Sequence, residues 1–289
     1  MKSIFIPMAL LLTTIATSSV TAAEAEDISF LSIPHEIKAE IGVLLDIPNL
    51  KNYGETSKDC NEAMKGALRI HTARVSASQL TAENIVILRR FGTLDLQVDN
   101  ANDNTMSCIG QLTNLKILNL SNSQVTDAGL LHLQNLQNLQ TLYLNNLPIT
   151  DNGLQCVQNL TNLVGLDLIG TQVTDAGLPH LQNLLKLEWL GLGITQVTDT
   201  GLPCVQHLPK LNSLGLESTQ VTDAGLQYLP NVSELFLVNT QITDAGLPYL
   251  HTLQNLTTLN VRGTQVTAAG IVTLKQHLTN QAKVISDLP

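Results

Sequence analysis

The chain has 289 residues, 44% of them hydrophobic, so it holds enough apolar side chains to bury a sizeable core, and wholesale disorder is excluded. Its 24 acidic residues outnumber its 15 basic ones, which gives a formal net charge of −9, and only 3% of its residues are aromatic. This composition lacks the basic surface that nucleic-acid binding requires and argues against that function. Enzymatic, binding and scaffolding functions all stay open at this point.

Residues 1–22 have the order of a secretory signal peptide. Lys2 supplies a positive start, the stretch from Ile4 to Ala16 is apolar apart from two threonines, and small residues that suit cleavage follow. An apolar stretch of about a dozen residues is too short to span a bilayer comfortably. We therefore expect cleavage, export to the periplasm or the exterior, and no stable membrane span afterwards; a retained N-terminal anchor is the alternative.

Residues 23–66 predict a small all-α unit, because apolar residues recur about every 3.5 positions and Pro34 suits a helix start. The segment resembles an F-box, whose pattern opens with Leu-Pro-x-Glu and continues along an apolar helix ridge. The matching residues here are Ile33, Pro34, Glu36, Ile37, Ile41 and Leu45. The aromatic residue that usually follows the later Ser-Lys pair is missing, and Cys60 and Asn61 stand there instead. A helical cap on the domain that follows is the alternative.

A repeat dominates the chain up to residue 280. Its first apolar residue recurs every 24 positions and once after 21, at Leu115, Leu139, Leu163, Leu187, Leu211, Val232 and Leu256, and Phe91 opens an earlier, degenerate unit. A unit reads L-x-x-L-x-L-x-x-T-x-V-T-D-A-G-L, as in residues 163–178. The pattern resembles the leucine-rich-repeat family, with Thr or Ser standing where that family usually has Asn or Cys.

Two spacings inside each unit predict its shape. Leu166 and Leu168 alternate as on one face of a strand, whereas Leu178 and Leu181 are three apart, as on one face of a short helix. Parallel strands stack about 4.8 Å apart but packed helices need roughly 8–10 Å, so the stack must bend. We expect an α/β horseshoe over residues 67–280, with strands concave and helices convex, and a tail or cap over 281–289. The 21-residue unit that begins at Leu211 is expected to have a shortened helix.

A Thr-Asp pair and a glycine recur in each unit. The pairs start at Thr126, Thr150, Thr174, Thr198, Thr222 and Thr243, and a glycine follows each aspartate after one residue. Threonine caps helix N-termini, and an aspartate in the first turn suits the helix dipole. A cation held by the stacked carboxylates is the alternative. The glycines indicate close backbone packing.

Three cysteines share one phase of the repeat. Cys108, Cys156 and Cys204 are 48 residues apart, and His132 and His180 stand at the same phase between them. This phase falls on the convex helices, where neighbours lie roughly 10 Å apart. That separation is too large for a shared zinc ion, and the cysteines are too far apart for disulfides. We expect packed free thiols, no metal site and no cofactor.

The concave face holds the candidate partner-binding residues, which are Tyr143, Asp167, Trp189, Glu217 and Phe236. Trp189 is the only tryptophan, and Gly165, Gly191 and Gly215 are expected around it, leaving the indole room to lie flat or leaving a pocket beside it. A rigid aromatic residue among carboxylates is typical of a binding hot spot. Because strands favour aromatic residues in any case, a scattered surface aromatic is the alternative.

The order of the segments suggests a function. No H-E-x-x-H, G-x-S-x-G or P-loop motif occurs in the sequence, so we expect no enzyme. An F-box-like segment before leucine-rich repeats resembles the F-box/leucine-rich-repeat substrate receptors, which implies docking on the Skp adaptor of a cullin ubiquitin ligase while the repeats hold the substrate protein. Together with export, this implies a bacterial effector that acts in a host. The alternative is an exported periplasmic or cell-surface binder without a ubiquitin role.

Overall fold

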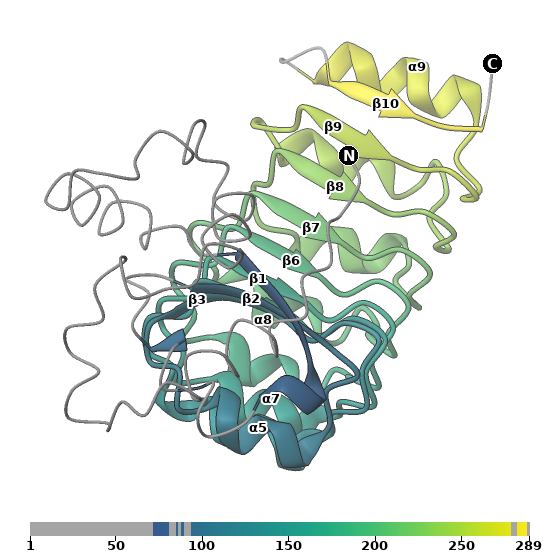
Figure 1. Ribbon diagram of the computed structural model, residues 1–289. Coiled ribbons are helices and arrows are strands. Elements are labelled where there is room, and N and C mark those ends of the chain that lie inside the picture. The colour runs from purple at the N-terminus through teal and green to yellow at the C-terminus, as the bar shows by residue number, and fades with distance from the viewer. Residues whose placement is uncertain (1–71, 81–84, 86–87, 90–93, 279–281, 288–289) are drawn as a thin grey trace, which may run out of the picture.

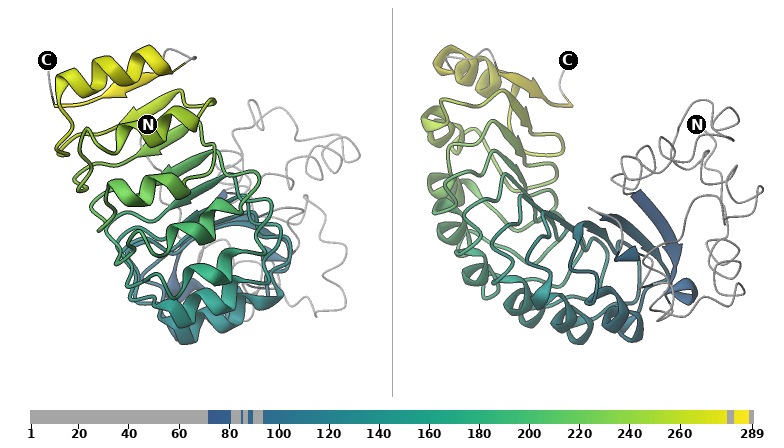
Figure 2. Two further views of the ribbon diagram at one scale, coloured as in Figure 1. Left: turned by 180° about the vertical axis from the view of Figure 1, so that it is seen from behind. Right: turned by 60° about the vertical axis from the view of Figure 1, so that its left-hand side comes forward.

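The computed structural model describes residues 72–80, 85, 88–89, 94–278 and 282–287. Within them, ten strands form one parallel sheet in which each strand pairs with the next along the chain. The strands line the concave side of a crescent and the short helices cover its convex side (Figure 2). The expected horseshoe is therefore confirmed, whereas the expected signal peptide (1–22) and F-box-like segment (23–66) lie outside the described residues.

The elements follow the repeat closely (Figure 1). The strands are β1 Thr72–Ser76, β2 Leu94–Asp99, β3 Leu115–Asn119, β4 Thr141–Tyr143, β5 Gly165–Asp167, β6 Trp189–Gly191, β7 Ser213–Gly215, β8 Glu234–Phe236, β9 Thr258–Asn260 and β10 Lys283–Ile285. The α-helices are α5 Asp103–Ile109, α6 Asp127–Leu130, α7 Asp151–Val157, α8 Leu202–Gln206 and α9 Ala268–His277. The 3-10 helices are η4 Ala77–Gln79, η5 Leu131–Asn135, η6 Leu178–Leu181, η7 Asp223–Tyr228 and η8 Leu247–Thr252. Strand β10 extends the sheet into the stretch expected to be a tail or cap.

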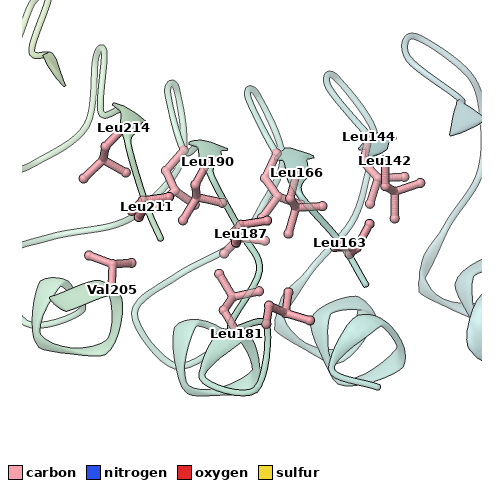
Figure 3. Close-up of a cluster of buried hydrophobic side chains, with 14 of the residues drawn as sticks. Leu142, Leu144, Leu163, Leu166, Leu181, Leu187, Leu190, Val205, Leu211 and Leu214 are labelled. Carbon is pink, nitrogen blue, oxygen red and sulfur yellow. The ribbon is translucent and has the colours of Figure 1, made fainter. Parts of the chain in front are cut away.

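The core is a continuous stack of leucines between the sheet and the helices (Figure 3). Leu142, Leu166 and Leu190 project from consecutive strands, and each is at most 1% exposed. Leu181, from η6, meets them from the convex side. Burial of a leucine side chain stabilises the fold by roughly 1.5–3 kcal/mol. The buried leucines thus stabilise every coil, and the side chains on the opposite face of the strands are not needed for the core.

The structure departs from a strict 24-residue repeat at two places. Strand β2 contains an irregularity between Leu94 and Asp95, so that Gln97 pairs with Asn119 of β3, whereas a count of 24 residues back from Asn119 leads to Asp95. In the 21-residue unit the helical stretch after Thr222 is the six residues of η7, whereas the stretch after Thr243 runs nine residues to the end of η8. Five residues then lead to the next strand in both units, so the helical stretch is shortened, as expected.

A hydrogen-bonded ladder joins successive units through the Thr-Asp pairs. Each aspartate accepts the backbone N–H of the threonine one unit later through Oδ1, at 2.8–2.9 Å, and its hydroxyl through Oδ2, at 2.5–2.7 Å. The ladder runs from Asp103 to Thr267. The threonines also accept a backbone N–H as helix caps, as expected. The carboxylates thus bind the next coil.

The recurrent glycine makes room for this ladder. A Cβ atom on Gly201 would lie 2.5 Å from Oδ1 of Asp175, and a Cβ atom on Gly177 would overlap Oδ1 of Asp151. The same crowding recurs in every unit from Gly129 to Gly270. Thr, Asp and Gly therefore form one device, in which the glycine admits the carboxylate of the preceding unit and the aspartate binds the threonine of the following one. The expected close backbone packing is, in detail, packing against this carboxylate.

A double-mutant cycle on Asp151 and Gly177 tests the device. Asp151→Ala removes both bonds to Thr174 and is expected to lower the free energy of unfolding by about 2 kcal/mol. Gly177→Ala forces Asp151 out of place and is expected to cost about 1–3 kcal/mol. The double variant should cost at least about 1 kcal/mol less than the sum, because the added methyl group then no longer displaces a carboxylate. Denaturant unfolding measures all three, with Glu188→Ala as a control that removes an exposed carboxylate outside the ladder. Additive costs would contradict the device.

A second prediction concerns the turn after each strand, where one residue has positive φ. Asparagine or glycine fills this place in most units, but Ile194 fills it after β6 with φ 54° and a side chain 60% exposed. A left-handed conformation costs an ordinary L-residue roughly 1–2 kcal/mol, and asparagine tolerates it better. Ile194→Asn should therefore raise the free energy of unfolding by about 1 kcal/mol. Val272→Asn, on an exposed helical position, is the control and should give no gain; an equal gain from both variants would contradict the explanation.

Candidate partner-binding face

The concave face presents three rows of side chains that run across the strands. The first row is Ile117, Thr141, Gly165, Trp189, Ser213, Glu234 and Thr258; the second is Asn119, Tyr143, Asp167, Gly191, Gly215, Phe236 and Asn260. Backbone hydrogen bonds between successive units continue the same register beyond the strands into a third row, which is Asn145, Ile169, Gly193, Glu217, Val238 and Arg262. Since side chains alternate along a strand, these rows oppose the buried leucines. All five candidate residues thus lie on one face.

Trp189 lies flat over the neighbouring strand. A Cβ atom on Gly165 would overlap the Cε2, Cζ2 and Nε1 atoms of the indole, so the side chain covers this glycine. The indole also packs against Tyr143, with ring centroids 5.4 Å apart and an angle of 36° between the planes. Both side chains are half-buried. The glycine gives the indole room to lie flat, as the sequence suggests, and it is Gly165 alone of the three expected glycines that underlies the indole.

The other glycines underlie the two carboxylates. Asp167 Oδ1 lies 2.9 Å from the place of a Cβ atom on Gly191. Glu217 Oε2 lies 2.9 Å from the place of a Cβ atom on Gly193 and 2.8 Å from that on Gly215. Asp167, from β5, and Glu217, from the turn after β7, thus lie over backbone that carries no side chains.

The environment of the carboxylates disfavours their charge. Burial raises the pKa of Asp167, although a hydrogen bond from the backbone N–H of Ile169 opposes this. Burial also raises the pKa of Glu217; a hydrogen bond from its own backbone N–H opposes this, and the negative charge of Asp167 raises the pKa further. Oε2 of Glu217 is inaccessible to solvent and has no hydrogen-bond partner among the described residues. In that part of the chain no lysine or arginine pairs with either carboxylate.

Phe236 completes the second row at a distance from the aromatic pair. It pairs in register with Gly215 and is half-buried, and the structure records no ring contact between it and Trp189. The glycines Gly191 and Gly215 therefore separate two aromatic flanks. Sequence analysis missed Gly193 and the seating of the carboxylates over glycine, although the Gly-Leu-Gly run of residues 191–193 is their visible signal.

The convex cysteines behave as expected of packed thiols. Cys108, Cys156 and Cys204 are free and half-buried against the core. Burial, and then the charges of Asp127 and Asp175 respectively, raise the pKa of Cys156 and of Cys204, which disfavours the reactive thiolate. Over the described ranges, no group of three or more His, Cys, Asp or Glu side chains is placed to hold a metal ion.

None of the helices that the structure describes combines the length and apolar character needed to cross a bilayer.

Comparisons with known proteins agree with this architecture. A family model described as "Leucine Rich repeat" matches residues 111–133 and 252–275. The crystal structure of an internalin C2 from Listeria monocytogenes is 24% identical, with a TM-score of 0.59, and the match covers 73% of this chain and 91% of that one. An internalin (inlF) from the same organism is 19% identical, with a TM-score of 0.43, over 88% and 90% of the two chains. The comparison with curated protein sequences yields no match. The chain carries leucine-rich repeats and has the fold of a leucine-rich-repeat solenoid.

Proposed function

We propose that the chain is a non-enzymatic module that binds a partner protein on its concave face. The aromatic pair of Trp189 and Tyr143 at the middle of that face carries the proposal. A half-buried aromatic cluster on an otherwise accessible face is the kind of surface from which protein interfaces draw most of their binding energy.

The distribution of aromatic residues supports this location. The described residues include five Phe, Tyr or Trp side chains, which are Tyr143, Trp189, Tyr228, Phe236 and Tyr249. Three of the five project from the inner face of strands β4, β6 and β8. In a chain with so few aromatic residues, their gathering on the face that the core does not use favours recognition there.

Removal of the indole tests the proposal. Peptides selected from a random phage-displayed library on the wild-type chain serve as probes. Trp189→Ala should weaken their binding by about 2 kcal/mol or more, roughly thirtyfold, because it removes the centre of the hot spot. The half-buried indole contributes little to the core, so the circular dichroism spectrum should stay that of the folded chain.

Tyr249→Ala is the matched control, since it removes an exposed aromatic side chain from η8 on the convex side. It should leave peptide affinity unchanged in the same titration. Selected peptides that bind Trp189→Ala as tightly as wild type would place recognition away from this face.

A second candidate function is that of an exported adaptor for a ubiquitin ligase. It is favoured by the F-box-like residues Ile33, Pro34, Glu36, Ile37, Ile41 and Leu45, which stand directly before the repeats and after the signal-like residues 1–22. In this function the F-box-like segment docks on the Skp adaptor of a host cullin ligase and the concave face holds the substrate protein. The alternative is an exported binder in which residues 23–66 only cap the solenoid.

A pull-down with purified Skp adaptor separates the two. The adaptor function predicts that the wild-type chain retains Skp and that Ile33→Ala/Pro34→Ala does not, because the substitutions remove the start of the apolar ridge. Trp189→Ala is the control and should retain Skp, since it alters the other end of the proposed assembly. Failure of the wild-type chain to bind Skp would leave the concave-face function and remove the adaptor.

A further inference from the structure

We propose that the concave face between Trp189, Asp167 and Glu217 binds an arginine side chain of the partner protein. This inference rests on the proposed function and names the chemistry of its partner. The occupant is a basic segment of another protein that presents one arginine to this surface.

The geometry places two carboxylates over one small stretch of backbone, and the indole lies over Gly165 of the strand before it. Gly191 and Gly193 of β6 and the turn after it lie between Asp167, from the strand before, and Glu217, from the unit after. Trp189 stands on the same face of β6, two residues before Gly191. Asp167 Oδ1 and Glu217 Oε2 each lie 2.9 Å from the place that a Cβ atom would take on Gly191 and Gly193, respectively, and the Ile169 side chain also packs over Gly191.

The carboxylates have bonding capacity that the described residues do not use. Among these residues, Oε2 of Glu217 has no hydrogen-bond partner, and no basic side chain neutralises it or Asp167. By contrast, the neighbouring Glu234 accepts the hydroxyl of Ser213 at 3.0 Å. Because Oε2 is inaccessible to solvent in the free chain, a donor brought by a partner reaches it only after the Glu217 side chain turns outward; the charge attraction then adds to the hydrogen bond.

Charge complementarity selects a basic partner. The chain carries a formal net charge of −9, and Asp167, Glu217 and Glu234 all project from the inner face of β5 to β8 or just beyond it. Arg262 is the basic residue of the third row, and it lies two strands from Glu217, 3.9 Å from Asp287. The centre of the concave face therefore repels acidic segments and attracts basic ones.

The ring beside the carboxylates favours arginine over lysine. A guanidinium group is planar, stacks on an aromatic face and donates in parallel to a carboxylate, whereas an ammonium group is a compact, strongly hydrated point charge. A metal ion is a poorer occupant, because no group of three or more ligating side chains is present in the described part of the chain.

The test compares peptides that differ only at arginine. Peptides from the phage selection on wild type are resynthesised with each arginine replaced by glutamine or by lysine, and are titrated against the full chain. Trp189 is the only tryptophan, so its fluorescence reports binding at the site. Replacement of one arginine by glutamine should weaken binding about tenfold or more, and replacement by lysine by a smaller factor.

Two conservative variants test the carboxylates. Glu217→Gln and Asp167→Asn should each remove most of the preference for arginine over glutamine, whereas Tyr249→Ala should keep it. Glu217→Gln should also melt at the same temperature as wild type or above it at neutral pH. The sign follows from the pKa of Glu217, which is raised in the folded chain, so that its ionised form opposes folding above that pKa. A melting temperature below that of wild type would contradict the unpaired carboxylate and overturn the proposal.

The pH dependence provides an independent readout. The affinity for the arginine peptide should fall as the pH is lowered from neutrality toward 4.5, the ordinary value for glutamate, because carboxyls with raised pKa take up protons early in that range. The affinity for the glutamine peptide should change little.

The outcomes separate this inference from the function on which it rests. Peptides that need Trp189 but bind equally well with glutamine in place of arginine overturn the arginine site and leave the concave-face function intact. Peptides that do not need Trp189 overturn both.

Discussion

The bond from each aspartate to the threonine of the next unit is the interaction on which the rest of the structure depends. Apolar packing alone would let one coil slide over another, because leucine contacts have no direction. The carboxylate fixes the neighbour through two donors, one of them a backbone N–H, so it sets both the distance and the register between coils. The glycine that admits this carboxylate cannot be replaced without moving it. From β2 to β9 this repeated alignment acts together with the backbone hydrogen bonds of the sheet, whereas β1 and β10 pair with their neighbours without it.

This division of labour explains why the concave face can carry a site. Leucines hold each coil together from within, and the Thr-Asp-Gly device holds successive coils together near the helix starts. Neither uses the inner rows of side chains. Those rows are therefore free of both tasks, and at their centre the side chains of Trp189, Asp167 and Glu217 lie over glycines, where a Cβ atom would crowd them. Among the described residues, Glu217 is desolvated and its Oε2 accepts no hydrogen bond. Neither feature stabilises the fold.

Sequence periodicity predicts the architecture because each unit shows both a spacing of two, typical of a strand, and a spacing of three, typical of a helix. These spacings can be read in one unit without reference to the others. It also places Tyr143, Asp167, Trp189, Glu217 and Phe236 on one face, since period two is a local property of a strand. It does not reveal the bonds between units, because a spacing of 23 residues from Asp to Thr is invisible until the coils are stacked. The irregularity of β2 was missed for a related reason: a degenerate unit offers no template for deciding where a residue is gained or lost. The orientation of the indole over Gly165 depends on the adjoining strand and is likewise a property of the stack.

The ladder also has a polarity. Each aspartate accepts hydrogen bonds from the threonine of the next unit toward the C-terminus. Thr267 donates the last of them, and Ala268 stands where the next aspartate of the ladder would be. A unit copied into the interior between Asp103 and Thr267 would therefore keep a carboxylate before it and a threonine after it. A unit copied in after α9 would lack the preceding carboxylate and would be joined to the stack, as β10 already is, through its strand alone.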